Sequence, residues 1–537
     1  MIPASRASTQ PPRTAAPVSL VVKLPPDGSK AQLRSDIDQA LGEDWRISRL
    51  FPPDPDKPEL MRWFVVAGPL SLAENLAHGQ AAWEAAHRLQ RTGAYEIEPQ
   101  VPKSTYAPVR ASPRARAAAQ PHLPGSSSKT WALEKARVLQ AWQLPPRPGG
   151  QADGSGVVVG HPDTGYSRHP ELYPASLDLD LDRDVVDADD DAQDPMRQGT
   201  VGHGTATGCV IAGRRAGQLA GVAPGATLRP IRAIIDVVVV FGGDVALAID
   251  YARRTGSHVI SMSLGGLFLG GVRDAVNAAV EDGCIVMAAA GNVWPWVVEP
   301  ANYPSCIAVA ATNANDQKWV DSASGHQVAV SAPGESVWTA VWRGGTADVE
   351  RRSGTSYAVA HVAGIAALWL AHHGAETIRK RYGSGTSAAF RRLLTSTART
   401  PTGWNSRSMG AGIVNAEALL SAPLPAARGL APRRAPRRLQ PTTARDALRD
   451  LSSRSAFDAI SRAVERGSVP RRAEGRRAPP PPSPEADLLY REMVYLATEV
   501  PAVSASVRSA PRRARRDVPL LMSSLASPTL AELFAEA

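Results

Sequence analysis

The feature that most constrains the fold is a repeated alternation of short apolar strands with helices between residues 131 and 421. The apolar stretches are GVVVG, TLRPIRAI, HVISMSL, CIVMAAA and CIAVAA, and predicted helices begin near His203, Gly243, Val272 and Thr355. Strands that are apolar throughout are typical of parallel sheets covered by helices on both faces. We therefore predict an α/β domain of three layers, αβα, with a parallel sheet at its centre.

A different pattern precedes this domain. The predicted elements of residues 18–102 follow the order β-α-β-β-α-β, with SLVVKL, WRISRLF, RWFVVAG and YEIEPQV as strands. This order indicates a small α+β domain of the split ferredoxin-like type. Residues 1–17 are expected to be a disordered N-terminus. Residues 103–130, a mixture of Pro, Ser, Ala and Arg, are expected to form an exposed linker.

The chain beyond residue 421 is rich in Arg and Pro, with RRAPRR, RRAEGRRAPPPPSP and RRARR separated by short amphipathic pieces. We expect residues 422–537 to be a mostly disordered extension with short helices. The net charge of +9 is concentrated in this tail and in the linker. Clustered arginine can bind nucleic acid or an anionic membrane, but a preference for arginine codons is an alternative explanation. We predict no specific nucleic-acid partner.

The cysteines and the N-terminus carry no targeting or redox signal. The three cysteines, Cys209, Cys284 and Cys306, form no CxxC pair, so we interpret them as small buried apolar residues. The first twenty residues contain no apolar stretch of signal-peptide length, and no stretch reaches the length of a membrane span. These observations favour a monomeric, cytoplasmic protein; secretion by another route is the alternative.

Three polar residues stand where α/β sheets collect functional groups. Asp163 follows a predicted strand, His203 begins a helix in VGHGTATGCVIAG, and Ser356 opens an apolar helix in SGTSYAVAHVAG. Each residue alone is more often a cap, a turn or a loop residue. Their order along the chain, Asp then His then Ser, is the order of the catalytic triad in subtilisin and differs from that in chymotrypsin.

With these motifs the sequence resembles the subtilases, the subtilisin-like serine proteases. The matching segments are DTG at Asp163, GHGT at His203, SMSLGG at Ser261 to Gly266, AAAGN ending at Asn292, and GTS followed by HVAG around Ser356. The resemblance implies a subtilisin-like fold and a serine endopeptidase that hydrolyses proteins or peptides through an acyl-enzyme. It also implies a zymogen that processes itself.

The resemblance gives each matching residue a role. It makes Ser356 the nucleophile, His203 the base that takes its proton, and Asp163 the residue that orients the imidazole. The side-chain amide of Asn292 and the backbone N–H of Ser356 would stabilise the oxyanion of the tetrahedral intermediate. His361 lies five residues after Ser356, about 500° round the helix, so it is expected to be a packed helix residue.

Substrate contacts are expected along two segments. By the resemblance, Ser263, Leu264 and Gly265 pair with the substrate backbone as an edge strand and line the first specificity pocket. The segment AAAGN supplies the opposite wall, and Trp294 and Trp296 either narrow this pocket or pack their own loop. Neither segment contains an acidic residue, which argues against a pocket for Lys or Arg.

The chemistry requires no cofactor, but a structural calcium ion is one interpretation of the acidic run from Asp178 to Pro195. The spacing of its carboxylates does not match an EF-hand, and a solvated acidic loop is the alternative. We also interpret His161 and His169, on either side of Asp163, as structural or surface residues.

The N-terminal domain resembles a subtilase prodomain in the order of its elements. Such a domain assists folding and then occludes the cleft, which predicts self-cleavage between Lys103 and Lys129. A permanently attached accessory domain is the alternative. Two other functions stay open for the whole chain: a catalytically silent binding module, and a nucleic-acid-binding or membrane-binding protein that acts through its basic tail.

Overall fold

The computed structural model describes residues 18–69, 79–100, 127–197, 199–239, 242–266, 270–292, 294, 296–430, 484–499 and 526–535. The chain divides into two units. Unit 1 comprises Met1–Leu50, Arg62–Arg110 and Thr442–Ala537, and unit 2 comprises Phe51–Met61 and Ala111–Pro441.

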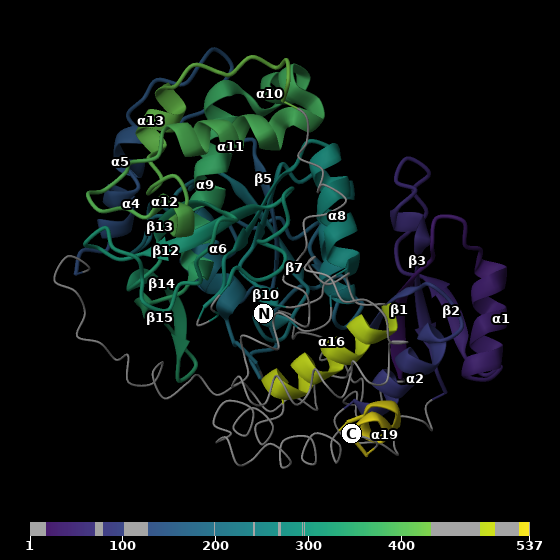
Figure 1. Cartoon of the computed structure of the whole chain (residues 1–537). Coiled ribbons are helices and arrows are strands. Elements are labelled where there is room, and N and C mark those ends of the chain that lie inside the picture. Colours follow the sequence, from purple (N-terminus) through teal and green to yellow (C-terminus); the bar gives the residue numbers. More distant parts are fainter. Residues whose placement is uncertain are drawn as a thin grey trace, which may run out of the picture. The chain divides into compact units, whose positions relative to one another are not determined.

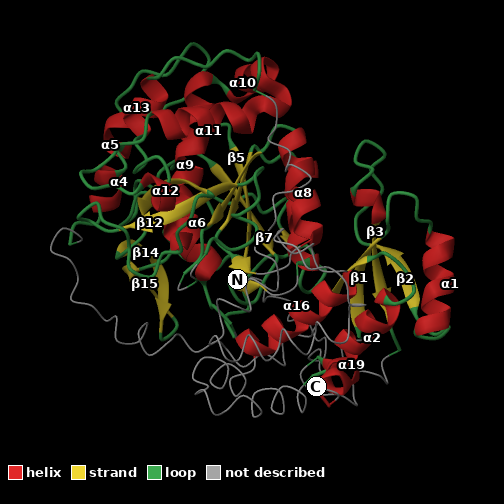
Figure 2. Cartoon of the chain, in the orientation of Figure 1, coloured by secondary structure: helices red, strands yellow, loops and turns green. Residues whose placement is uncertain are grey.

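A parallel sheet of seven strands forms the centre of unit 2 (Figure 2). In spatial order its strands are β13 (Val328–Pro333), β12 (Ile307–Thr312), β11 (Ile285–Ala289), β9 (Val259–Met262), β5 (Val158–Asp163), β7 (Thr227–Arg232) and β6 (Arg183–Asp184). Every residue of β9, β11 and β12 is buried, which explains why these strands are apolar without alternation. The predicted α/β fold with a parallel sheet is confirmed.

Helices cover both faces of this sheet (Figure 1). The helices α6 (His203–Ala212) and α9 (Thr355–His373) pack together, and α7 (Gly243–Arg254) and α8 (Gly270–Glu281) form a second pair. All 19 residues of α9 are buried, because its sequence is apolar on every side. These contacts complete the predicted three layers.

Smaller elements surround the three layers of unit 2. The remaining helices are α4 (Trp131–Lys135), α5 (Val138–Ala141), α10 (Ala375–Tyr382), α11 (Thr386–Ser396), α12 (Ser406–Met409) and α13 (Ala416–Ser421), with one 3-10 turn, η5 (Gly383–Gly385). The strands β14 (Val337–Arg343) and β15 (Thr346–Arg352) form an antiparallel hairpin, and β8 (Val238–Val239) pairs with β10 (Gly265–Gly266).

Within the described residues, no single helix combines the length and the apolar character of a membrane span. Among the described helices, only α9 together with Ala375–Ser396 is long and apolar enough, and this pair is bent by 90°.

The three cysteines are free and buried, and burial raises the pKa of each thiol to about 12. Thiols with so high a pKa are poor nucleophiles near neutral pH, as expected for structural residues.

An antiparallel sheet of four strands forms the N-terminal part of unit 1. Its strands are β1 (Ser19–Lys23), β2 (Arg46–Arg49), β3 (Trp63–Ala67) and β4 (Glu96–Gln100), in the order β2-β3-β1-β4. The helices α1 (Lys30–Ala40) and α2 (Gln80–Gln90) complete the order β-α-β-β-α-β, with a 3-10 turn, η1 (Leu60–Arg62), before β3. Assignment to the ferredoxin-like class stays a prediction, and residues 70–78, part of the second predicted helix, lie outside the described residues.

Unit 1 also contains two helices from the C-terminal extension, α16 (Pro484–Glu499) and α19 (Pro528–Ala535). Both helices contact α2. The sequence predicts short helices in this extension but does not predict where they pack. The boundaries drawn from the sequence between domains, linker and tail stay predictions, and residues 431–483, 500–525 and 536–537 lie outside the described residues.

The loop Phe51–Met61, which follows β2 in the sequence, belongs to unit 2. Its residue Asp54 accepts a hydrogen bond of 2.7 Å from the buried Arg253, near the end of α7. Arg253 also donates to Asp250 and Asp282, each at 2.6 Å. Three carboxylates therefore compensate one buried guanidinium, and removing the loop would leave one of these contacts unmade.

Candidate active site

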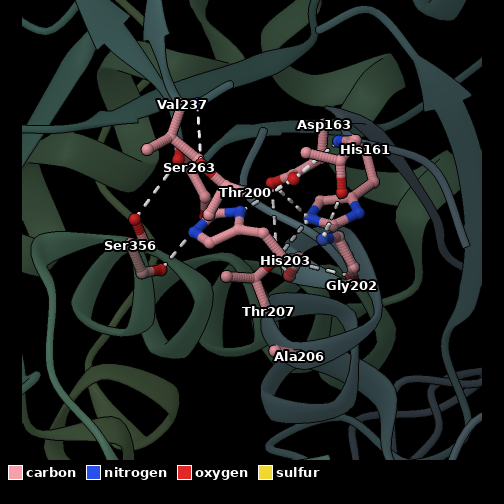
Figure 3. A network of polar contacts seen from close by, with 12 residues as sticks. His161, Asp163, Thr200, Gly202, His203, Ala206, Thr207, Val237, Ser263 and Ser356 are labelled. Carbon is pink, nitrogen blue, oxygen red and sulfur yellow. Dashed lines mark hydrogen bonds and ion pairs between the residues drawn. The ribbon is translucent and has the colours of Figure 1, made fainter. Parts of the chain in front are cut away.

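Asp163, His203 and Ser356 come from three different elements of unit 2. Asp163 is the last residue of β5, at the carboxyl end of the sheet, where open α/β folds gather functional groups. His203 is the first residue of α6, after Gly202 in the left-handed conformation (φ 70°), and Ser356 is the second residue of α9. Figure 3 shows the imidazole ring of His203 lying between Asp163 and Ser356.

Asp163 holds the ring of His203 by one nitrogen. The Oδ1 atom of Asp163 lies 2.8 Å from Nδ1 of His203 and accepts the backbone N–H of Thr164 at 2.7 Å. The other carboxylate oxygen has longer contacts, 3.4 Å to the hydroxyl of Thr207 and 3.7 Å to Nε2 of His161. With Nδ1 as the donor to Asp163, Nε2 of His203 is the nitrogen available for a second group.

The carboxylate of Asp163 is fully buried, yet it stays ionised near neutral pH. Burial by itself would raise its pKa, but attraction to His203, the hydrogen bond from that ring and the Thr164 N–H together lower the pKa below its ordinary value. Burial also lowers the pKa of His161, which is therefore neutral at pH 7. A buried, ionised carboxylate hydrogen-bonded to His203 is suited to stabilise the imidazolium that forms when His203 accepts a proton.

Two of the remaining histidines lie apart from the Asp163 carboxylate. His361, expected to be a packed helix residue, is buried and donates from Nδ1 to the carbonyl of Tyr357 at 2.8 Å. His169 is also buried, with Nε2 3.0 Å from the carbonyl of Asp348. His161 is buried as well, but its position against Asp163 was not expected from the sequence.

The hydroxyl of Ser356 is bonded to a carbonyl. It donates to the backbone oxygen of Ser263 at 3.2 Å, while the hydroxyl of Ser263 donates to the backbone oxygen of Ser356 at 3.0 Å. Among the described residues, no hydrogen bond joins the Ser356 hydroxyl to His203. For Ser356 to donate to His203, its hydroxyl must release the carbonyl of Ser263.

Two N–H donors converge beside Gly354. The Oδ1 atom of Asn292 accepts the backbone N–H of Thr355 at 2.9 Å and its hydroxyl at 2.8 Å. Because these donors can only face the amide oxygen, the Nδ2 amine of Asn292 points the other way. A Cβ at Gly354 would lie 3.6 Å from both that amine and the backbone nitrogen of Ser356. The two donors thus face one space, which a side chain at position 354 would enter.

Thr355 contacts a candidate site residue in a way that the sequence did not predict. The sequence suggested only that Thr355 starts the helix. In the structure both its N–H and its hydroxyl fix the orientation of the Asn292 amide. Its adjacency to Ser356 in the GTS motif is the one sequence signal that points to this role.

The segment expected to receive substrate is already paired. Strand β10 runs parallel to β8, and the N–H of Gly265 donates to the carbonyl of Val237 at 3.1 Å. Ser263 and Leu264, which precede β10, are buried. The sequence predicted that Ser263, Leu264 and Gly265 form an edge for an incoming peptide. A peptide that pairs with Gly265 must therefore take the place of β8.

The side chain of Val298 lies between the two expected walls of the specificity pocket. A Cβ at Gly265 would lie 2.5 Å from Cγ2 of Val298, and a Cβ at Gly291 would lie 3.1 Å from either of its methyl groups. The rings of Trp294 and Trp296 contact each other, with centroids 5.6 Å apart. The sequence singled out these tryptophans, whereas it gave no signal for Val298.

The acidic run from Asp178 to Pro195 does not converge on one point. Asp178 lies 2.7 Å from Arg229, and Asp184 pairs with Arg232. Asp182, Asp189 and Asp191 accept backbone N–H groups from within the run. In the part of the chain that the structure describes, no group of three or more His, Cys, Asp or Glu side chains could hold a metal ion. Because calcium also takes backbone carbonyls as ligands, a structural calcium ion in the acidic run stays a prediction.

The match to a family model lies within unit 2. The family model of the subtilase family, Peptidase S8, matches residues 154–412. Thermitase from Thermoactinomyces vulgaris is 36% identical over 251 residues, which are 46% of this chain and 84% of thermitase. Subtilisin Savinase from Lederbergia lenta is 32% identical over 268 residues, which are 49% of this chain and 91% of Savinase.

A solved structure also resembles this chain in its fold. It is the crystal structure of fervidolysin from Fervidobacterium pennivorans, described as a keratinolytic enzyme related to subtilisin. The TM-score is 0.53 at 20% identity, and the match covers 78% of this chain and 63% of fervidolysin. At this level of identity the likeness shows the fold alone.

Proposed function

Because the chain belongs to the subtilase family of serine peptidases, we propose that Ser356, His203 and Asp163 hydrolyse peptide bonds through an acyl-enzyme. The Ser356 hydroxyl attacks the scissile carbonyl while Nε2 of His203 takes its proton, and the imidazolium then delivers that proton to the leaving amine. Water, deprotonated by the same nitrogen, releases the acyl group from Ser356. Asp163 keeps the ring in the required tautomer and stabilises its positive form.

The observation that carries this proposal is the buried 2.8 Å contact between Asp163 and His203. Ionised Asp163 fixes Nδ1 as the protonated nitrogen, so Nε2 is the basic one, and the ring lies between Asp163 and Ser356 (Figure 3). In the proposed mechanism Ser356 leaves the carbonyl of Ser263 and turns to His203 when substrate binds. The N–H before the scissile bond would then take over the Ser263 carbonyl.

We assign the oxyanion site to the space beside Gly354. The Nδ2 amine of Asn292 and the N–H of Ser356 both face this space, and Thr355 prevents the amide from turning over. Such donors stabilise the transition state more than the ground state, because the oxygen becomes negative only as the hydroxyl attacks. The proposed chemistry uses side chains and backbone for every proton and charge, so it requires no cofactor. Its substrates are proteins or peptides.

Labelling with a fluorophosphonate tests this function directly. An active serine nucleophile is expected to bind the reagent covalently at Ser356, and Ser356→Ala protein is the matched control. Hydrolysis of a peptide library by the same preparation should depend on Ser356. Folded protein that neither binds the reagent nor cleaves any peptide would favour the alternative of a silent binding module.

We further propose that small side chains are preferred before the scissile bond. Val298 packs between Gly265 and Gly291, where it limits the space between the two expected pocket walls. Val298→Gly is therefore expected to shift cleavage in a peptide library from small to large apolar residues. Val297→Ala is the matched control, since Val297 packs near Gly325 instead. An unchanged preference in Val298→Gly protein that still hydrolyses peptides would contradict this assignment and leave the general function intact.

We also propose that the N-terminal domain is a prodomain, and that the enzyme cuts its own chain between Lys103 and Lys129. Mass spectrometry of the purified protein should then find a fragment that begins near residue 125, and this fragment should be absent from Ser356→Ala protein. Protein that stays full length while it hydrolyses peptides would favour the permanently attached accessory domain.

A further inference from the structure

The two ends of the chain together build unit 1. Its sheet and α2 come from the N-terminal domain, whereas α16 and α19 come from the C-terminal extension. Both C-terminal helices contact α2 (Figure 1). We call residues 484–499 and 526–535 the C-terminal segment.

The C-terminal segment buries a continuous set of apolar side chains. The ring centroids of Tyr495 in α16 and Trp83 in α2 lie 5.7 Å apart. The buried apolar residues of the segment are Leu488, Leu489, Tyr490, Met493, Val494, Tyr495, Leu496, Ala526 and Leu530. If the C-terminal segment separated from the rest of unit 1, these apolar side chains would be exposed to water. The free-energy cost of this exposure is proportional to the apolar area.

A buried carboxylate joins the three helices. In α16, Oε2 of Glu492 lies 2.6 Å from Nε2 of His87 in α2, and both side chains are 1% exposed. The same carboxylate accepts the backbone N–H of Ser527 at 2.6 Å and its hydroxyl at 2.9 Å. Ser527 immediately precedes α19. Separation of the helices would leave these polar groups without partners until water reached them.

The N-terminal domain in turn caps the C-terminal segment. The carboxylate of Glu84 in α2 accepts the N–H of Thr529, in the first turn of α19, at 2.9 Å. A carboxylate at this end of a helix is stabilised by the unpaired N–H groups there. Gln80 of α2 donates to the carbonyl of Ala526 at 2.7 Å. The hydrogen bonds therefore run in both directions between the chain ends.

From these contacts we propose that the C-terminal segment retains the N-terminal domain after the linker is cut. A cut between Lys103 and Lys129 breaks the linker, after which the domain is joined to unit 2 through its own loop Phe51–Met61, which belongs to that unit. The domain stays bound to the C-terminal segment, and that segment is covalently joined to unit 2 through residues 422–483. The relevance of this retention to activation rests on the proposed self-cleavage, but the retention itself does not.

The test uses full-length Ser356→Ala protein, so that self-cleavage plays no part. Recognition sites for a separate, sequence-specific protease are inserted after Arg110 and after Pro441, the boundaries between the two units. After cleavage at the first site alone, residues 1–110 are expected to co-elute with residues 111–537 in size-exclusion chromatography. After cleavage at both sites, residues 1–110 are expected to co-elute with residues 442–537.

Substitutions then identify the contact responsible. Glu492→Ala removes the buried carboxylate, and we expect co-elution of residues 1–110 with residues 442–537 to be lost. Glu485→Ala is the matched control, because Glu485 on the same helix makes only a half-exposed ion pair of 3.7 Å with Arg91, and here co-elution is expected to persist. If residues 1–110 or residues 442–537 elute alone after the double digest of protein without either substitution, the proposal is wrong.

Discussion

Each unit of this protein contains a buried cluster of one serine, one histidine and one carboxylate. In unit 2, His203 contacts Asp163 and lies beside Ser356. In unit 1, Glu492 contacts both His87 and Ser527, and all three side chains are at most 1% exposed. The two clusters match in composition, but the imidazole is central in the first and the carboxylate is central in the second.

This difference in the order of contacts distinguishes the proposed reactive site from a structural cluster. A carboxylate is a weaker base than an imidazole, so Glu492 can accept a hydrogen bond from Ser527 but is poorly suited to take its proton at neutral pH. Ser527 is also completely buried, which denies it a substrate. Composition alone therefore does not define a triad; the imidazole must stand between the other two groups and the hydroxyl must be reachable.

The largest effect should come from replacing the histidine of each cluster by alanine, one variant at a time. His203→Ala is expected to lower kcat by about 10⁶-fold, the size seen when a triad residue of subtilisin is removed. His87→Ala is expected to leave the kcat of folded enzyme within a few-fold of the parent. Steady-state hydrolysis of one peptide by both variants measures this, and equal losses in kcat would break the comparison.

The carboxylate of unit 1 should instead matter for stability. Glu492→Ala leaves His87 and two donors of Ser527 without their buried partner, which is expected to destabilise unit 1 by roughly 3–5 kcal/mol. Hydrogen exchange of the β1, β3 and β4 amides, followed by mass spectrometry, measures this loss. The exposed substitution Glu485→Ala should change these rates little. Unchanged protection of these amides in Glu492→Ala protein would show that the cluster does not stabilise unit 1.

The proposed oxyanion donor, Asn292, belongs to unit 2 and has no counterpart in the comparison of the two clusters. Asn292→Ala is expected to lower kcat by about 10²–10³-fold with little change in KM, because the lost hydrogen bond forms fully only in the transition state. Steady-state kinetics on the same peptide separate the two parameters. A rise in KM at unchanged kcat would place Asn292 in substrate binding instead.

A third buried histidine, His361, has a backbone carbonyl as its hydrogen-bond partner instead of a carboxylate. It therefore shows what burial does to a histidine that has no ionised partner. Burial lowers the pKa of His361 to about 4, although its hydrogen bond to the Tyr357 carbonyl opposes this shift. Below about pH 6.5 the unfolded chain binds a proton at this residue that the folded chain does not. The unfolding free energy therefore decreases as the pH is lowered, until the pH reaches the folded pKa. From pH 7 to pH 5 this residue should cost about 2 kcal/mol.

The substitution His361→Leu removes this titrating group and should flatten the dependence of stability on pH. Chemical denaturation of Ser356→Ala protein, with and without His361→Leu, measures the unfolding free energy at both pH values. His373, whose pKa burial also lowers to about 4, should leave a residual slope in both proteins. Identical slopes would mean that His361 is protonated in the folded state.

The smallest effect is expected at the serine of unit 1. Ser527→Ala removes one hydrogen bond to Glu492 and should destabilise unit 1 by about 1 kcal/mol. It should not alter labelling by a fluorophosphonate, whereas Ser356→Ala should abolish labelling. Loss of label on Ser527→Ala would show that a buried, carboxylate-bonded serine can react, against the distinction drawn between the two clusters.

The sequence was most informative where side-chain patterns and short motifs coincide. The parallel sheet follows from strands such as β11 and β12, whose apolar residues are buried on both faces. Asp163 and His203 could be located because each stands at the end of an element, and the fold brings such ends together. Neither inference needed knowledge of contacts between distant side chains.

Contacts made by the backbone, or between residues far apart in the sequence, could not be predicted. The pairing of β8 with β10 is made by backbone hydrogen bonds, which no side-chain pattern encodes. The contact between α16 and α2 joins His87 and Glu492, which are 405 positions apart in the sequence. The amphipathic pattern of α16 predicts an apolar face but does not indicate which element that face packs against. The role of Thr355 depends on the facing amide of Asn292, which lies 63 residues away.

If substrates bind along Gly265 as proposed, the pairing of β8 with β10 competes with them. A peptide that binds along Gly265 exchanges one set of backbone hydrogen bonds for another, so these bonds contribute little net affinity. Because β8 is part of the same chain, its local concentration at β10 is high. Selection among substrates then falls to side chains that fill the site and to segments long enough to contact both strands.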